Sequence, residues 1–210
     1  MALKNHQKEA IEGIEKVREY AEHHRKHTNL MYRGMLKTIR KLNPGGRCLE
    51  VGAGPGFLSM MIAEQLPELH ITALDLSPDM KTVAEEFIRE KNLESRITYL
   101  TADAADPRLQ GKLGAFDLVC TAFSLHHWKR PEEAVTNLWG MVRPGGALCI
   151  LDFRRIGWLC SLPIKWHELE SMKEAYKTGE LKALLQKAGI SKIRVKKPFP
   201  FLFHIVTAVK

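Results

Sequence analysis

The sequence has no long apolar run and few cysteines, and these absences exclude several classes of protein. No stretch approaches the ~20 consecutive apolar residues that a membrane-spanning helix needs. Residues 1–26 are charged throughout and lack the apolar segment of a signal peptide. The four cysteines form no Cys-x-x-Cys pair, which argues against a zinc site or a disulfide framework. We therefore expect a cytoplasmic protein with reduced thiols and no membrane insertion.

Charge alone does not identify a partner. The formal net charge of +8 permits attraction to nucleic acid, anionic lipid or an anionic small molecule. The basic residues are scattered at spacings typical of solvated faces, so nucleic acid is not favoured. His23 and His27 are four residues apart on one expected helix face, but their neighbours are basic and no carboxylate framework accompanies them. We expect no metal site.

The spacing of apolar residues predicts two helices followed by an alternation of strands and helices. Helices are expected over Lys4–His27 and Leu30–Leu42, before the turn residues Asn43 to Gly46. A further helix is expected from about Gly179 to Ala188, and then a closing antiparallel hairpin. Alternating strands and helices indicate a parallel sheet covered on both faces. The expected strands are Arg47–Val51, His70–Asp75, Arg96–Leu100, Phe116–Cys120 and Ala147–Asp152.

The most informative segment is a glycine-rich turn between the first strand and the next helix. Gly52, Gly54 and Gly56 alternate there, and glycines let the backbone approach a ligand closely. A dinucleotide fingerprint needs its third glycine at position 57, which is Phe57. A phosphate loop of the ATPase kind ends in Gly-Lys-Ser or Gly-Lys-Thr, but this turn has no lysine. Tight pyrophosphate binding is therefore disfavoured, and a purely structural turn stays an alternative.

A carboxylate ends the next strand. Asp75 follows the glycine turn by roughly 20 residues, a position where an acid accepts hydrogen bonds from the two hydroxyls of an adenosine ribose. The alternative role is a helix cap. Ser77, followed by Pro78, is better placed to cap the next helix, so we expect Asp75 to be free for a ligand.

The stretch Glu50 to Gly56 resembles the E-x-G-x-G-x-G motif of class I methyltransferases that use S-adenosyl-L-methionine (SAM). The resemblance is good over Leu42–Asp152 and looser elsewhere. It implies an α/β, Rossmann-like, seven-stranded sheet with strand order 3-2-1-4-5-7-6, strand 7 antiparallel, and helices on both faces. It also implies that residues 1–42 form a helical lid over a core of residues 43–210, within a single domain.

The resemblance carries over a set of cofactor-binding residues. In the family, the glycine turn faces the methionine part of the cofactor and the acid after the second strand holds the ribose. Asp103 and Ala104 match the adenine contact, and Thr121 matches a position near the methionine part. An ordinary turn at Asp103 and plain helix packing of Tyr32 are the alternatives. The expected cofactor-binding residues are Glu50, Gly52, Ala53, Gly54, Gly56, Asp75, Leu76, Asp103, Ala104, Thr121 and Tyr32.

The acceptor is expected near the carboxyl ends of the fourth and fifth strands, where ligands of open α/β sheets collect. The run Ser124 to Trp128 resembles a signature of small-molecule methyltransferases of ubiquinone and menaquinone biosynthesis. His126 and His127 have the pKa range of a general base, and Asp152 is placed to bind substrate. Packing of the histidines, or a strand-ending role for Asp152, are the alternatives. The residues expected around the methyl group are Thr121, Ser124, His126, His127, Trp128, Asp152 and Arg154.

The predicted function is therefore transfer of a methyl group from SAM to a small-molecule acceptor by in-line displacement, which leaves S-adenosyl-L-homocysteine (SAH). The fourth strand ends Cys120-Thr121-Ala122-Phe123, not in the Asn/Asp-Pro-Pro-Tyr/Phe pattern of enzymes that methylate exocyclic base amines. RNA or protein methylation, or binding of SAM without catalysis, stay as alternatives. No motif specifies the acceptor or the oligomeric state.

Overall fold

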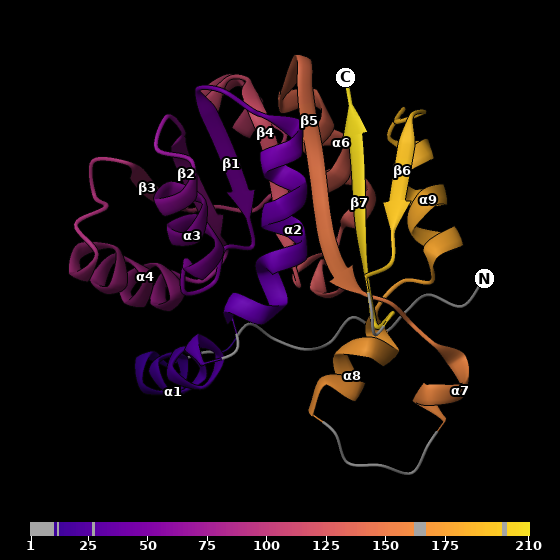
Figure 1. The fold of residues 1–210 in the computed structure, drawn as a ribbon, viewed down its shortest axis with the longest axis horizontal. Coiled ribbons are helices and arrows are strands. Elements are labelled where there is room, and N and C mark those ends of the chain that lie inside the picture. Colours follow the sequence, from indigo (N-terminus) through magenta and orange to yellow (C-terminus); the bar gives the residue numbers. More distant parts are fainter. Residues whose placement is uncertain (1–10, 12, 27, 162–166, 199–200) are drawn as a thin grey trace.

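The computed structural model describes residues 11, 13–26, 28–161, 167–198 and 201–210. These residues form one mixed sheet with helices on both faces (Figure 1). The strands are β1 (Arg47–Val51), β2 (His70–Asp75), β3 (Ile97–Thr101), β4 (Phe116–Ala122), β5 (Val142–Phe153), β6 (Ile193–Lys196) and β7 (Phe203–Val209). The helices are α1 (Ile14–Arg25), α2 (Thr28–Leu42), α3 (Phe57–Gln65), α4 (Pro78–Glu90), α5 (Leu109–Leu113), η1 (Leu125–His127), α6 (Pro131–Met141), α7 (Gly157–Cys160), α8 (His167–Glu174) and α9 (Thr178–Lys187).

The sheet confirms the expected topology. Its order is β3-β2-β1-β4-β5-β7-β6. Strands β1 to β5 pair in parallel, while β7 is antiparallel to both β5 and β6. The strand order reverses beside β1, between β2 and β4, and ligands of open α/β sheets bind at the carboxyl ends of strands flanking such a point.

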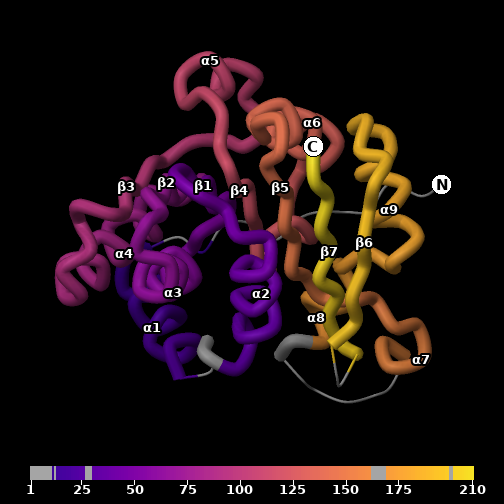
Figure 2. Tube along the Cα trace, turned by 45° about the horizontal axis from the view of Figure 1, so that its top comes forward, coloured from indigo at the N-terminus to yellow at the C-terminus, as the bar shows by residue number. Residues whose placement is uncertain are grey.

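Two apolar layers cover the sheet. One buried cluster joins the inner faces of α1 to α4 to the sheet, and a second joins α5, α6 and α9 to the opposite face. Figure 2 shows α1 and α2 beside α3 and α4, and α1 packs directly on α4. An ion pair of 2.7 Å between Arg18 and Glu86 links these two helices. The N-terminal helices are thus part of the same apolar core as the glycine turn.

Several segment boundaries differ from those expected. The first helix begins at Ile14, because Gly13 has φ 96° and so cannot continue a right-handed helix; its expected start at Lys4 lies outside the described residues. Strand β3 is displaced by one residue, and β4 and β5 are longer than predicted. The early start of β5 has partners on both sides, since Val142 pairs with Phe116 of β4 and Gly145 N–H donates to Lys210 O at 2.8 Å.

The carboxyl edge of the sheet carries the remaining helices. Strands β1 and β5 end at the edge where α1, α7 and α8 lie (Figure 1). A small apolar cluster at this edge is centred on Phe153, Met172 and Ala175, and Met31, Phe123 and Phe203 pack against it. The edge is therefore covered by apolar side chains from distant parts of the sequence.

The thiols lie mainly within the sheet, as free cysteines. All four cysteines are free, and Cys48, Cys120 and Cys149 are buried on three adjacent strands. No helix in the described part of the chain is long and apolar enough to span a bilayer.

Candidate functional site

The glycine turn is built by backbone geometry that only glycine adopts easily. Gly52, Gly54 and Gly56 have φ values of 67°, 51° and 78°. The N–H groups of Gly52 and Ala53 both donate to Leu74 O of β2, at 2.7 and 3.1 Å. A side chain added at Gly54 would meet no atom within 4 Å, so the backbone there is open on one side. The turn is thus fixed to β2 and leaves room for a ligand at Gly54.

Asp75 is held against this turn. Its Oδ2 accepts from Gly54 N at 2.9 Å, and its Oδ1 accepts from Ser77 N at 3.0 Å. Ser77 Oγ caps α4 by accepting from Met80 N, as predicted. Asp75 does not cap α4, as expected, although both of its carboxylate oxygens accept backbone N–H groups. Each oxygen still has a second lone pair for a ligand hydroxyl.

Glu50 lies beneath the turn, on β1. It is 2% exposed, and the Ser59 hydroxyl of α3 donates to its carboxyl group. Burial raises the pKa of Glu50 to about 8, so the buried carboxyl is largely protonated at neutral pH. The Tyr99 hydroxyl of β3 donates to Gly54 O at 2.5 Å. Tyr99 is a contact that sequence reasoning missed, since it has no motif around it.

Tyr32 comes from α2 toward the same region. Burial, and next the nearby Glu50, raise its pKa, and its ring centroid lies 5.9 Å from that of Phe123. Its position therefore bridges the glycine turn and the segment that follows β4. This placement fits the predicted covering role, which stays a prediction.

The residues expected around adenine lie on the loops after β2 and β3. Leu76 is 61% exposed, which is unusual for a large apolar side chain at a strand end. Asp103 forms an ion pair of 2.7 Å with Arg130 and accepts from Ala105 N at 2.8 Å. Ala104 O accepts from the side chain of Asn137 at 3.2 Å. Leu76 is open to a flat ligand, whereas Asp103 already has partners.

A buried histidine and a buried aspartate meet at the carboxyl edge. His126 Nδ1 and Asp152 Oδ1 are 2.7 Å apart, and His126 N donates to Asp152 Oδ2 at 3.1 Å. Both side chains are only about 1% exposed. Asp152 also accepts from Phe153 N, so the carboxylate is fully oriented. The sequence placed these residues at one edge, and the structure joins them directly.

His126 Nε2 and Thr121 Oγ1 are buried and have no hydrogen-bond partner among the described residues. The hydrogen bond at Nδ1 assigns the ring proton to that nitrogen, which leaves a lone pair on Nε2. Buried polar atoms are almost always paired in proteins, so such atoms at a strand end are expected to meet a ligand.

His127 has a different environment. It is exposed, and its Nδ1 lies 3.4 Å from Glu174 Oε2 of α8. Its ring centroid is 3.9 Å from that of His126, and the two ring planes are tilted by 47°. Of the two predicted bases, only His126 is paired with Asp152.

His204, which sequence reasoning missed, lies on the other side of Asp152. It is directly opposite Asp152 in the β5–β7 register and is 0% exposed. Burial lowers its pKa to about 4, so the ring is neutral at physiological pH. Neither ring nitrogen has a partner among the described residues. The available signal was a histidine within the apolar run Leu202 to Val206.

The other residues expected near the acceptor have structural partners. Ser124 Oγ accepts from Trp128 Nε1 at 2.9 Å, and Arg154 Nε donates to Phe201 O at 2.9 Å. The described residues hold no group of three or more metal-ligating side chains, and the side chain of His27 lies outside them.

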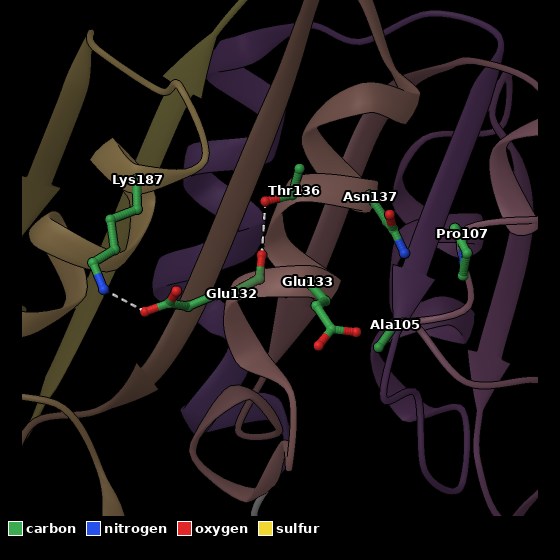
Figure 3. Close-up of a pocket in the computed structure, with 7 residues that line it drawn as sticks. All are labelled: Ala105, Pro107, Glu132, Glu133, Thr136, Asn137 and Lys187. Atoms are coloured by element: carbon green, nitrogen blue, oxygen red, sulfur yellow. Dashed lines mark hydrogen bonds and ion pairs between the residues drawn. The ribbon is translucent and has the colours of Figure 1, made fainter. Parts of the chain in front are cut away.

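One cavity lies away from the glycine turn (Figure 3). Its volume is about 330 Å³, and α6 supplies Glu132, Glu133, Thr136 and Asn137 to its wall. Lys187 of α9 is paired with Glu132 at 2.5 Å across it. Because its polar side chains already have partners within the protein and no glycine of the turn lines it, the cavity does not fit the cofactor site.

Comparison with known proteins agrees with this geometry. Residues 49–150, about half of the chain, match the family model of a methyltransferase domain. The chain is 34% identical over 107 residues to a demethylmenaquinone methyltransferase of Thermus thermophilus, covering 51% of this chain and 47% of that protein. It is 31% identical over 123 residues to the ubiquinone/menaquinone biosynthesis C-methyltransferase UbiE of Rhizobium meliloti, covering 56% and 47%. It thus spans about half the length of the curated relatives it matches.

The fold matches solved structures over nearly its whole length. A SAM-dependent methyltransferase from Aquifex aeolicus superimposes with a TM-score of 0.73 at 18% identity, over 95% of this chain and 99% of that one. Together with the strand order and the glycine motif, the matched domain shows that the chain belongs to the class I SAM-dependent methyltransferases.

Proposed function

We propose that this chain methylates a small-molecule acceptor with SAM as the methyl donor. The observation that carries the proposal is the contact between the glycine turn and the carboxylate after β2, in which Gly54 N donates to Asp75. This pairs an open, lysine-free backbone turn with an acid at the position that binds a ribose diol. The relatives named above act on quinone precursors, which supports a small-molecule acceptor.

The residues present fit the cofactor. The open side of Gly54 and the unpartnered Thr121 hydroxyl suit the methionine part, and Asp75 suits the ribose. The exposed Leu76 offers an apolar face to adenine, with Asp103 and Ala104 beside it. Tyr32, on the helices of residues 1–42, would cover the site. When bound, SAM supplies a methyl group already activated by its sulfonium. On this basis we propose that all the residues predicted from the sequence to bind the cofactor do so.

His126 is proposed as the general base. Asp152 holds its Nδ1–H and stabilises the imidazolium that forms when Nε2 takes a proton. This suits an acceptor whose hydroxyl, amine or acidic carbon loses a proton as it is methylated. His127, which is exposed and near Glu174, is proposed to support the loop through its ring contact with His126. The His126–Asp152 pair is buried beside Phe153, so water is excluded there. The exclusion of water strengthens the electrostatic interactions of the pair.

The proposed setting is the cytoplasm, with a free small molecule as the partner. Two other activities stay as alternatives: methylation of RNA or protein, which the net charge of +8 permits, and binding of SAM without turnover.

The test uses SAM labelled in its methyl group, incubated with the protein and with separated small-molecule, RNA and protein fractions of a cell extract. We expect label in the small-molecule fraction only, and none with the variant His126→Gln, which should still bind SAH. Label in RNA or protein would assign the activity to that class. Binding of SAH without label in any fraction would favour the non-catalytic alternative.

A further inference from the structure

Ser124 lies in contact with the glycine turn. A methyl group added at Gly52 would be 1.9 Å from Ser124 Oγ and 2.4 Å from its Cβ. Such distances mean that the Ser124 side chain already touches the backbone of Gly52. Gly52 itself is fixed to β2 through its N–H to Leu74 O. The first residue of the turn therefore cannot shift toward β4 without moving Ser124.

Ser124 also directly precedes η1, the short helix that carries His126. Its Oγ accepts from Trp128 Nε1 at 2.9 Å, and its carbonyl accepts from His127 N at 2.9 Å. These two hydrogen bonds join Ser124, which precedes His126, to the two residues that follow His126. A displacement of Ser124 would therefore move the backbone on both sides of His126.

The other end of this segment is anchored to β5. Phe123 has φ 52°, a conformation uncommon for a bulky residue, and its N–H donates to Leu151 O at 2.8 Å. Leu151 directly precedes Asp152. The segment is therefore attached at two places: Ser124 contacts the glycine turn, and Phe123 is hydrogen-bonded to the end of β5. A shift at either place would change the geometry of the His126–Asp152 pair.

We propose that Ser124 is a positioning residue that couples occupation of the glycine turn to the placement of His126. The proposal rests on the function proposed above, because it takes the turn as the cofactor site and His126 as the base. Because Ser124 lies against Gly52, a ligand that shifts the Gly52 backbone on binding also moves Ser124, and with it the segment that carries His126. In this role Ser124 acts through its contacts with Gly52 and Trp128.

The substitution Ser124→Ala breaks this coupling with little change in volume. It removes the oxygen that touches Gly52 and accepts from Trp128, and it leaves the backbone bonds intact. We expect SAH affinity within about three-fold of the wild type, and a loss of at least ten-fold in kcat on the acceptor found with labelled SAM. Trp128→Phe removes the donor but keeps Ser124 against Gly52, so its effect should be smaller. Ser95→Ala, at an exposed site, is the matched control.

The direct readout is nuclear magnetic resonance of the imidazole nitrogens of His126 and the indole N–H of Trp128 during a titration with SAH. In the wild type and in Ser95→Ala, saturation with SAH should shift both sets of signals. In Ser124→Ala, SAH should still bind, but the shift at His126 should fall to less than half. A loss of stability alone would not remove this response, and the thermal midpoint is measured in parallel.

The outcomes separate the two proposals. If SAH binds to the wild type and the His126 signals do not respond, or if Ser124→Ala keeps the full response and the full kcat, the coupling role is wrong while the cofactor site stands. If SAH does not bind to the wild type at all, the proposed function is wrong and the coupling role with it.

Discussion

Two carboxyl groups, Glu50 and Asp75, lie beneath the glycine turn on neighbouring strands. Burial raises the pKa of both, and the nearby Asp75 further raises the pKa of Glu50. Such a pair does not by itself stabilise the fold, because removing carboxyl groups from water costs free energy. Their retention at the point where the strand order reverses fits a ligand that supplies hydrogen-bond donors.

The His126–Asp152 pair leads to a prediction about catalysis. His126→Gln should lower kcat about 10²- to 10⁴-fold, since it removes the proposed base. Asp152→Asn should also lower kcat, because the amide cannot stabilise an imidazolium. The matched control is His127→Gln, which removes an exposed ring and should change kcat by less than about five-fold. Steady-state kinetics and SAH binding check these expectations. Equal losses from His126→Gln and His127→Gln would contradict the assignment of the base.

His204 leads to a prediction about stability and pH. Its pKa in the folded protein is lowered to about 4, whereas an unfolded histidine has a pKa near 6.5. The unfolded chain therefore takes up the proton first as pH falls. The stabilisation is complete above pH 6.5 and is lost progressively between pH 6.5 and 4. At pH 4.5, this amounts to about 2 to 3 kcal/mol in the free energy of unfolding.

The variant His204→Leu should lack this contribution. Urea unfolding at pH 7.5 and 4.5 should therefore show a smaller loss for the variant, by about 2 kcal/mol. An identical loss in both proteins would show that another group controls the acid side of the stability curve.

Among elements, the three central strands carry buried thiols. Cys48, Cys120 and Cys149 lie on β1, β4 and β5, and burial raises the pKa of Cys149 to about 12. Only Cys160, on α7, is partly exposed. Because the thiolate is the reactive form, we expect one thiol to react quickly with a soluble disulfide reagent at pH 8. All four should react in denaturant. Fast reaction of more than one thiol in the native protein, or its persistence in Cys160→Ser, would contradict this packing.

The elements also show what the sequence could and could not predict. Strands β1 and β2 were predicted residue by residue, because their apolar runs end at glycine and at the cap residue Ser77. The start of β5 is not predictable from its own residues, since it depends on pairing with Phe116 and with Lys210, which are distant in the sequence. The hydrogen bond between His126 and Asp152 is likewise not predictable from the sequence. Only the sheet brings together side chains that are 26 residues apart.

On the scale of the whole molecule, the proposed cofactor and acceptor residues share one edge of the sheet. The glycine turn follows β1, Asp75 ends β2, His126 follows β4 and Asp152 lies near the end of β5. Helices α1, α7 and α8 lie at this edge (Figure 1). Parallel strands necessarily bring their carboxyl ends to one edge, which explains how residues scattered from 50 to 152 form one site.

The most direct test of this account is calorimetric titration of the wild type, Asp75→Ala and Asp106→Ala with SAH and with NAD. Asp106 is a partly exposed acid paired with Arg108, so it serves as the matched control. We predict that the wild type binds SAH and not NAD. Loss of one or more charge-assisted hydrogen bonds of about 1.5 to 3 kcal/mol in Asp75→Ala should weaken SAH binding about 10- to 150-fold, and Asp106→Ala should leave it unchanged. Equal SAH affinity in the wild type and Asp75→Ala, or preference for NAD, would contradict the account.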